Sequence, residues 1–188
     1  MIIVYAHPNK EGHCGEILRL VRSLLNDKNI SYELLDLYAM HYDPVLKPEE
    51  HYTSGHRDVS KENETIQGLF KNESRFIIIY PTWWNGMPAI LKGFFDRLMI
   101  PRFAYSYEKT IPIKLLSGKA AVFSSFGGPR VFGKFYAGDR SLKQISKDIL
   151  AFCGIRAKCY AIDNARKLTP SQGKKIERKV NKALSWLL

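Results

Sequence analysis

The feature that most constrains the fold is a repeated alternation of short apolar runs with segments of helical periodicity. The apolar runs predict strands at residues 2–6, 31–37, 76–80, 120–124 and 156–162. Apolar residues at helical spacing predict helices around residues 17–25 and over residues 61–71, 88–99, 142–152 and 170–187. Such alternation indicates a mostly parallel sheet with helices on both faces, and runs that are apolar throughout are typical of strands buried on both sides. We therefore predict an α/β fold of three layers around a five-stranded parallel sheet.

Residues with strong local preferences support these boundaries. Pro88 suits the first turn of a helix, Gly154 suits the position just after one, and Thr169 is a good N-cap before Pro170. The segment of residues 40–60 is the exception, because it is polar, aromatic and irregular. A connection of that length in a compact domain is usually functional or part of an interface.

Length and composition predict one ordinary globular domain over residues 1–188. The chain is 45% hydrophobic and 25% charged, the usual balance of a globular protein. No stretch approaches the roughly 18 apolar residues of a membrane helix, and the first residues do not resemble a signal peptide. Cys14, Cys153 and Cys159 have no CxxC spacing, which argues against a zinc site and a disulfide framework. We expect a cytoplasmic protein with free thiols, no bound metal and no membrane insertion.

The net charge of +11 raises the question of an anionic partner. The basic residues are scattered, apart from a dense stretch at residues 174–182 that is typical of a solvated helix face. No recognised nucleic-acid motif accompanies the charge, so we do not expect nucleic-acid binding. Phosphorylated cofactors are the better explanation of a basic chain.

Three loops of unusual composition follow predicted strands, and ligands of open α/β sheets bind at the carboxyl ends of the strands. The first loop contains His7, Gly12 and Gly15 and leads into a helix, whose N-terminal amides favour an anion such as phosphate. A simple strand-to-helix connection with surface histidines is the alternative. The loop matches neither a Rossmann fingerprint nor a Walker loop.

The second and third loops combine aromatic residues with glycines. Trp83 and Trp84 follow the strand at residues 76–80, and two adjacent tryptophans either belong to the core or line a site for a flat ligand. On an extended segment one ring could pack inward while the other faces the ligand. Gly127 and Gly128 follow the strand at residues 120–124 and allow a ring to approach closely, although an ordinary glycine turn is equally consistent with them. The three loops together predict one site at one sheet edge.

Several motifs in order resemble one family over nearly the whole chain. They are Ile-Val-Tyr-Ala-His at residues 3–7, Asp-Leu-Tyr-Ala-Met at residues 36–40, Asp-Pro-Val-Leu at residues 43–46, the long stretch from Tyr80 to Arg97, Ser-Phe-Gly-Gly at residues 125–128, Gly-Asp at residues 138–139 and Phe-Cys-Gly at residues 152–154. The chain resembles the NAD(P)H:quinone oxidoreductases with a flavodoxin-like fold, which include DT-diaphorase, modulator of drug activity B and the ancillary flavoproteins of glutathione-gated potassium efflux.

The resemblance implies a bound flavin, FMN or FAD, and the short chain favours FMN because it leaves less protein to hold an adenosine. It implies two-electron hydride transfer from NAD(P)H through the flavin to a quinone-like acceptor, for which we expect ping-pong kinetics, and a homodimer to which residues 40–60 contribute. The loop with His7 would hold the flavin phosphate, and the other two loops would hold the ring. The predicted cofactor-binding residues are His7, Gly12, His13, Cys14, Gly15, Pro81, Thr82, Trp83, Trp84, Asn85, Ser125, Phe126, Gly127 and Gly128.

Catalytic side chains are harder to assign. The position of a charge-relaying histidine in DT-diaphorase is Ala137 here, so that role is not carried over. Tyr136 and Tyr105 are candidates for shaping the acceptor pocket, with simple packing as the alternative. Two other functions remain open: a regulatory flavoprotein subunit of a potassium-efflux transporter, and a one-electron carrier of the flavodoxin type. Such carriers are typically acidic, unlike this basic chain.

Overall fold

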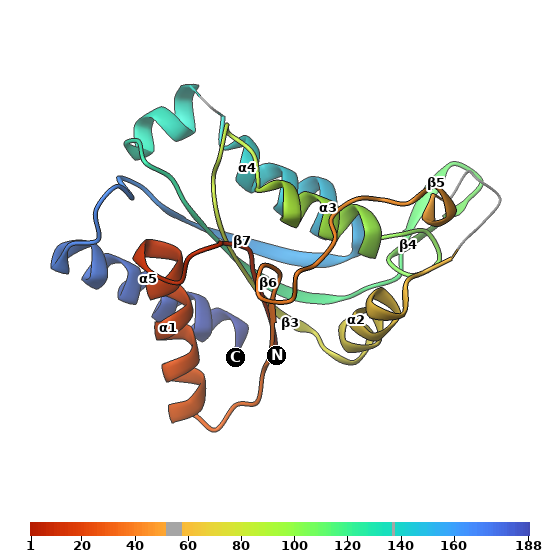
Figure 1. The fold of residues 1–188 in the computed structure, drawn as a ribbon, viewed down its shortest axis with the longest axis horizontal. Coiled ribbons are helices and arrows are strands. Elements are labelled where there is room, and N and C mark those ends of the chain that lie inside the picture. Colours follow the sequence, from red (N-terminus) through yellow and green to blue (C-terminus); the bar gives the residue numbers. More distant parts are fainter. Residues whose placement is uncertain (52–57, 137) are drawn as a thin grey trace.

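The computed structural model describes residues 1–51, 58–136 and 138–188, without the side chain of Tyr136. Its centre is a parallel sheet of five strands in the order β2-β1-β3-β6-β7 (Figure 1). The strands are β1 (Ile2–Tyr5), β2 (Glu33–Asp36), β3 (Arg75–Pro81), β6 (Gly118–Ser125) and β7 (Ile155–Ile162). This confirms the predicted α/β class and the five parallel strands.

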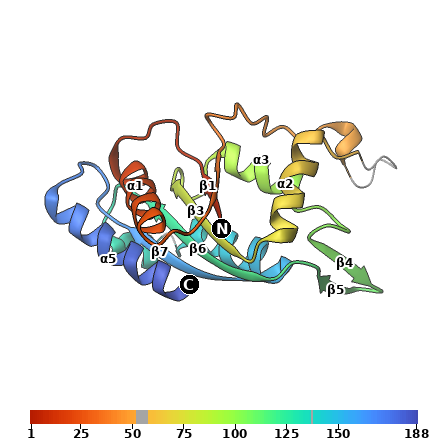
Figure 2. The same cartoon turned by 90° about the horizontal axis from the view of Figure 1, so that it is seen from below.

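Helices cover both faces of the sheet, as predicted. On one face lie α1 (Gly12–Asp27) and α5 (Pro170–Leu187), which run side by side (Figures 1 and 2). The other face carries α2 (Lys61–Asn72), α3 (Ala89–Leu98), the short α4 (Arg140–Lys143) and the π-helix η3 (Gln144–Ala151) that continues α4. Ser60 and Thr169 cap α2 and α5 through their hydroxyl oxygens, which accept from the amides of Asn63 and Gln172.

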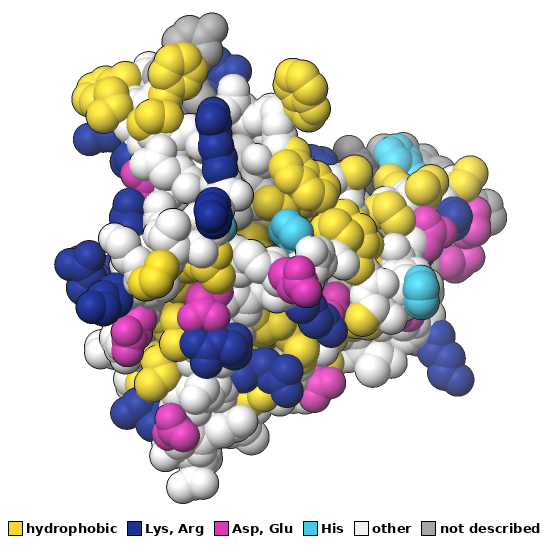
Figure 3. All heavy atoms as spheres, turned by 60° about the vertical axis from the view of Figure 1, so that its left-hand side comes forward, with side chains coloured by type: hydrophobic (Ala, Val, Ile, Leu, Met, Phe, Trp, Pro, Cys, Tyr) yellow, Lys and Arg dark blue, Asp and Glu magenta, His cyan; other side chains and the backbone are white. Residues whose placement is uncertain are grey.

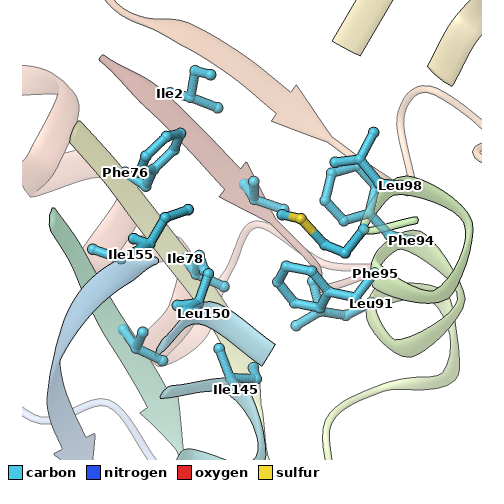
Figure 4. Close-up of a cluster of buried hydrophobic side chains, with 14 of the residues drawn as sticks. Ile2, Phe76, Ile78, Leu91, Phe94, Phe95, Leu98, Ile145, Leu150 and Ile155 are labelled. Carbon is cyan, nitrogen blue, oxygen red and sulfur yellow. The ribbon is translucent and has the colours of Figure 1, made fainter. Parts of the chain in front are cut away.

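Two hydrophobic clusters, one on each face, hold the layers together. Because successive strand residues point to opposite faces, Ile3 and Ile77 pack under α1 and α5, while Ile2 and Ile78 pack under α2 and α3. Figure 4 shows the second cluster, where Phe94 and its neighbours on α3 meet the sheet. Burying such side chains stabilises the fold by roughly 1.5–3 kcal/mol each.

An antiparallel hairpin, β4 (Tyr105–Glu108) with β5 (Ile111–Lys114), was not predicted. It lies outside the main sheet and far from the carboxyl ends of β1, β3 and β6 (Figures 1 and 2). A left-handed Lys109, with a φ of 55°, makes its turn. Its side chains are largely exposed, so the short strands lack the apolar run by which the core strands were recognised.

A buried ion pair fixes the long connection between β2 and α2. Arg97 on α3 donates to both carboxylate oxygens of Glu50, with Nε 2.8 Å from Oε2, and also to the Asp43 carbonyl. Glu50 ends the short 3-10 helix η1 (Pro48–Glu50). Most of the predicted functional segment 40–60 is therefore anchored to α3, and residues 52–57 of it lie outside the described residues.

The helices and the cysteines of the described part of the chain bear on membrane insertion and on disulfides. In the part of the chain that the structure describes, no helix has the length and apolar character needed to cross a membrane. All three cysteines are free thiols, as expected: Cys14 and Cys153 are buried and Cys159 is exposed.

Candidate functional site

The loops that follow β1, β3 and β6 meet at one edge of the sheet, as the sequence predicted. The Ala6 amide donates to the Ile79 carbonyl over 2.9 Å, and the Thr82 amide donates to the Ser125 carbonyl over 2.7 Å. The hydroxyls of Thr82 and Ser124 lie 2.6 Å apart. These bonds continue the strand pairing past the last residues of the strands, so the three loops share one rigid base.

The first loop is held in shape by its own polar groups. The Asn9 amide donates to His7 Nδ1 over 3.0 Å, and the Tyr5 hydroxyl donates to the Asn9 carbonyl over 2.8 Å. Because Nδ1 of His7 is engaged within the loop, Nε2 is the nitrogen left for a ligand. The loop lies against α1 at Gly15, where an added Cβ would sit only 1.5 Å from the Lys10 carbonyl oxygen. Only glycine therefore fits at this position.

The first turn of α1 is open to an anion. The turn begins at Gly12 with a φ of 81°, Glu11 at the N-cap makes no side-chain cap, and no acidic residue lies in the turn. His13 is buried there, and its Nε2 atom has no hydrogen-bond partner among the described residues. Burial lowers the pKa of His13, so the ring is neutral at pH 7. A phosphate oxygen would satisfy the free amides of this turn.

Cys14 and Ser125 join the first loop to the third beneath the site. Cys14 Sγ lies 3.2 Å from Ser125 Oγ, and both side chains are buried. Burial raises the pKa of Cys14 to about 11, although the hydrogen bond to Ser125 acts in the opposite direction. The thiol is therefore protonated at neutral pH and acts as a packing and hydrogen-bonding group.

The second loop presents both tryptophans to solvent. Trp83 and Gly86 form a tight antiparallel turn with bonds of 3.1 and 2.9 Å, and the two central residues, Trp84 and Asn85, both have positive φ. This is the geometry of a type I′ hairpin. Trp83 is 42% exposed and Trp84 is completely exposed. The core interpretation of this pair is therefore wrong, as is the expectation that one ring packs inward.

The third loop continues into a segment that carries exposed apolar side chains. The Phe126 amide donates to Ile162 and the Asn164 amide to the carbonyl of Gly128, which ties this loop to the end of β7. The π-helix η2 (Phe132–Tyr136) follows. Its Phe132 and Phe135, with the preceding Val131, are 60%, 77% and 67% exposed. Figure 3 shows hydrophobic side chains gathered at the upper left of this face, where η2 lies in Figure 1.

An ion pair closes this segment on itself. Arg130, before η2, donates to both carboxylate oxygens of Asp139, after it, with Nη2 2.6 Å from Oδ2. The hydrogen bond from Arg130 holds the pKa of Asp139 below its usual value, so the pair stays charged at neutral pH. Asp139 is left-handed with a φ of 53° and precedes α4. The ion pair therefore fixes both ends of the segment that bears the exposed phenylalanines.

A small cavity of about 50 Å³ opens between the second loop and the start of α4. Thr82, Asn85 and Phe126, which were predicted as site residues, line one side of it. Asp139, Arg140 and Ser141 on the other side were not predicted as site residues. The Gly-Asp pair at residues 138–139 was the available signal, because it is one of the motifs that carry the family resemblance.

The sequence analysis named two tyrosines as candidates, and the structure places the side chain of one of them, Tyr105, away from this arrangement. Tyr105 lies on the β4–β5 hairpin, where its ring contacts Tyr107 and Phe152 at 5.7 and 5.0 Å between ring centres. It lines a different cavity, of about 480 Å³, beside α3 and η3. Tyr136 ends η2, but its side chain lies outside the described residues, as does Ala137.

Comparison with known proteins settles the family. Residues 1–187 match the model of a family described as having a flavodoxin-like fold. The chain belongs to this family. It is 31% identical over 156 residues to a protein named FMN-dependent NADH:quinone oxidoreductase from Clostridium perfringens, covering 80% of this chain and 77% of that one.

Two solved structures show how far the fold is shared. The crystal structure of Smu.1420 from Streptococcus mutans superposes with a TM-score of 0.85 at 34% identity and covers 98% of both chains. An FMN-dependent NADH-azoreductase from Bacillus anthracis, solved in complex with FMN, gives a TM-score of 0.80 at 19% identity, with 100% of this chain and 99% of that chain covered. At that identity the second likeness concerns the fold alone.

Proposed function

We propose that residues 1–188 form one flavodoxin-like domain that binds FMN and acts as an NAD(P)H:quinone oxidoreductase. The observation that carries the proposal is the exposed pair Trp83 and Trp84, presented between the first loop and the glycine-bearing third loop at one sheet edge. Leaving two indole rings in water is unfavourable unless a ligand covers them. A flat, partly apolar ring with a phosphate tail matches the chemistry of both parts of the site.

The names of relatives support the same activity. The Clostridium perfringens relative is named an FMN-dependent NADH:quinone oxidoreductase, and a human relative, 24% identical over 197 residues, is named ribosyldihydronicotinamide dehydrogenase [quinone]. The alignments cover 80% of this chain for the first relative and 93% for the second. Their cofactor and substrates are therefore our proposal for this site.

The residues of the first loop fit the phosphate of FMN. The open amides of the first turn of α1, His7 Nε2 and the unpartnered His13 Nε2 are hydrogen-bonding groups without a carboxylate among them. We propose that they bind the phosphate, with Gly12, Cys14 and Gly15 forming the backbone of that cradle. Pro81, Thr82, Trp83, Trp84, Asn85, Ser125, Phe126, Gly127 and Gly128 are proposed to line the ring.

The chain contributes binding and orientation more than acid or base groups. When bound, FMN supplies the hydride chemistry between NAD(P)H and the quinone. Amides of the second and third loops would donate to the polar edge of the ring, and preorganised amides stabilise developing charge there without a side-chain acid. Asp139 remains paired with Arg130 and so keeps its charge and position. We propose that both substrates use the same open face in turn.

Analysis of the released cofactor tests the proposal directly. We expect purified protein to be yellow, to release FMN by mass and absorbance, and to oxidise NAD(P)H with a quinone acceptor along parallel initial-rate lines. Intersecting lines together with a trapped ternary complex would rule out sequential use of one face. A colourless protein that ignores added FMN would overturn the function itself.

We also propose a homodimer and a cytoplasmic location. The cavity of about 480 Å³ lies beside α3 and η3, next to the anchored segment 43–50. Its apolar wall consists of Met99, Ile100, Ile149 and Phe152. An apolar surface of this kind suits contact with a second copy of the chain. The free thiols agree with a reducing compartment. A monomeric mass by light scattering at micromolar concentration would contradict the dimer.

A further inference from the structure

A third cavity, strongly basic, lies at the outer edge of β7. Its volume is about 380 Å³, and it opens between α4 and η3 on one face of the sheet and α5 on the other. The charged side chains that line it are Arg130, Asp139, Lys143, Lys179 and Lys182. Four cations and one carboxylate therefore surround the cavity, and neither the family comparison nor the flavin site accounts for this excess.

The positive charge in the cavity is not neutralised by the protein. Asp139 pairs with Arg130, whereas Lys143, Lys179 and Lys182 make no ion pair within 4.0 Å with any carboxylate of the described residues. Lys179 instead donates to the Ala161 carbonyl. Burial, followed by the charge of the nearby Lys175, lowers the pKa of Lys179. An anion in the cavity would relieve the repulsion among these lysines.

A buried hydroxyl lines the same cavity without a partner. Tyr160 is 7% exposed, and its hydroxyl makes no hydrogen bond in the part of the chain that the structure describes. Buried hydroxyl groups are normally satisfied, because an unpaired one costs about 1–3 kcal/mol. The combination of a donor hydroxyl and several ammonium groups suits a phosphate, which accepts several hydrogen bonds at once.

The basic cavity adjoins the proposed flavin site. Asp139 and Leu142 line both this cavity and the smaller one beside Thr82 and Asn85. In the sheet order, β7 lies two strands away from β3, which is about 10 Å. An extended dinucleotide with its nicotinamide at the flavin site spans that distance, so its far end can reach the basic cavity past Asp139 and Leu142, which line both cavities.

We propose that this cavity binds the 2′-phosphate of NADPH, so that the chain uses NADPH in preference to NADH. The inference rests on the proposed function, because it places the nicotinamide end of the same molecule at the flavin. Lys143 and Lys182 are the specificity-determining residues, with Lys179 and the Tyr160 hydroxyl completing the phosphate site. The curated relative named for NADH gives no reason to expect this preference.

The first test is calorimetric and does not depend on activity. We expect 2′,5′-ADP to bind the FMN-loaded protein at least about tenfold more tightly than 5′-AMP, and K143Q/K182Q to abolish the difference, as the loss of charged hydrogen bonds predicts. The matched control K28Q/K174Q removes two exposed lysines that do not line the cavity and should retain the difference. Equal binding of 2′,5′-ADP and 5′-AMP to wild type would overturn the proposal. So would inorganic phosphate binding as tightly as 2′,5′-ADP, since the cavity would then recognise free phosphate.

The second test separates this inference from the flavin function. In K143Q/K182Q we expect KM for NADPH to rise about tenfold while KM and kcat for NADH stay at the wild-type values. Equal changes for both substrates would indicate that the lysines only shield the exposed edge of β7, and would overturn the assignment. A protein that oxidises neither substrate refutes the proposed function, and the calorimetric comparison still decides the phosphate site.

Discussion

Replacing Gly15 by alanine tests whether the first loop must lie directly against α1. A Cβ at this position would sit 1.5 Å from the Lys10 carbonyl oxygen and 2.3 Å from its carbon. Since ordinary contact begins near 3.4 Å, loop and helix must separate by about 2 Å. Overpacking against backbone typically costs about 1–3 kcal/mol, which corresponds to a fall in Tm of about 2–12 °C for a chain of this size. The same displacement moves the proposed phosphate donors, so we expect FMN affinity to fall at least about tenfold.

The assay is thermal unfolding of the apo protein together with fluorescence titration of FMN. Gly68 on α2 offers a matched control, because an added Cβ there has nothing within 4 Å. G68A should raise stability by about 0.4–1 kcal/mol through the unfolded state and leave FMN binding unchanged. If G15A melts with the wild type and binds FMN equally well, the close packing of loop and helix does not govern the site, and this reasoning fails.

Four further outcomes follow from single features. W84G should raise the apo Tm, because it relieves a left-handed tryptophan that buries nothing, and should weaken FMN binding in the same titration. R97A should cost about 3–5 kcal/mol in urea unfolding, because it leaves Glu50 buried without its cation. Burial acts to raise the pKa of Glu50, but the hydrogen bond from Arg97 holds it below the usual value. The contribution of Glu50 to the free energy of unfolding is therefore present above about pH 4.3 and is lost as pH falls further. In R97A the free energy of unfolding should depend less steeply on pH in this acid range. Burial raises the pKa of both thiols, that of Cys14 to about 11, so iodoacetamide should label the exposed Cys159 before the buried Cys14 because of its exposure, as peptide mass spectra would show.

The core helices and strands could be predicted because buried positions recur along the chain as a pattern of apolar residues. Residues 76–80 are apolar throughout and proved to be a strand buried on both faces, and the N-cap at Thr169 marked the start of α5. Continuous burial and local capping depend on neighbouring residues in the chain, which a sequence displays. The convergence of the three loops followed from the parallel order of the strands.

The features that escaped prediction depend on contacts across the fold. The exposure of Trp84 could not be predicted from its residue type. Burial of an apolar side chain is favourable whether the protein core or a bound ligand covers it, and the sequence does not distinguish the two. The pairing of Arg130 with Asp139 joins the two ends of a segment whose path the sequence does not specify. The basic cavity gathers residues from β7, α4 and α5, so scattered lysines in the chain become neighbours only in space.

The strand order has a consequence for how the protein is made. Tyr5 pairs with Ile79, and Pro81 pairs with Ser125, so the sheet edge that carries the three loops is complete only once β6 has left the ribosome. At about 5–20 residues per second, the first loop waits on the order of ten seconds for its two partners. During the first part of that interval neither β2 nor β3, the two neighbours of β1 in the sheet, has been made. The apolar β1 must then be protected from contact with other chains. The proposed cofactor can therefore be loaded only late in synthesis, and a chain interrupted before Ser125 would hold the phosphate cradle and the second loop but lack the third loop, Ser125 to Gly128, that is proposed to line the ring.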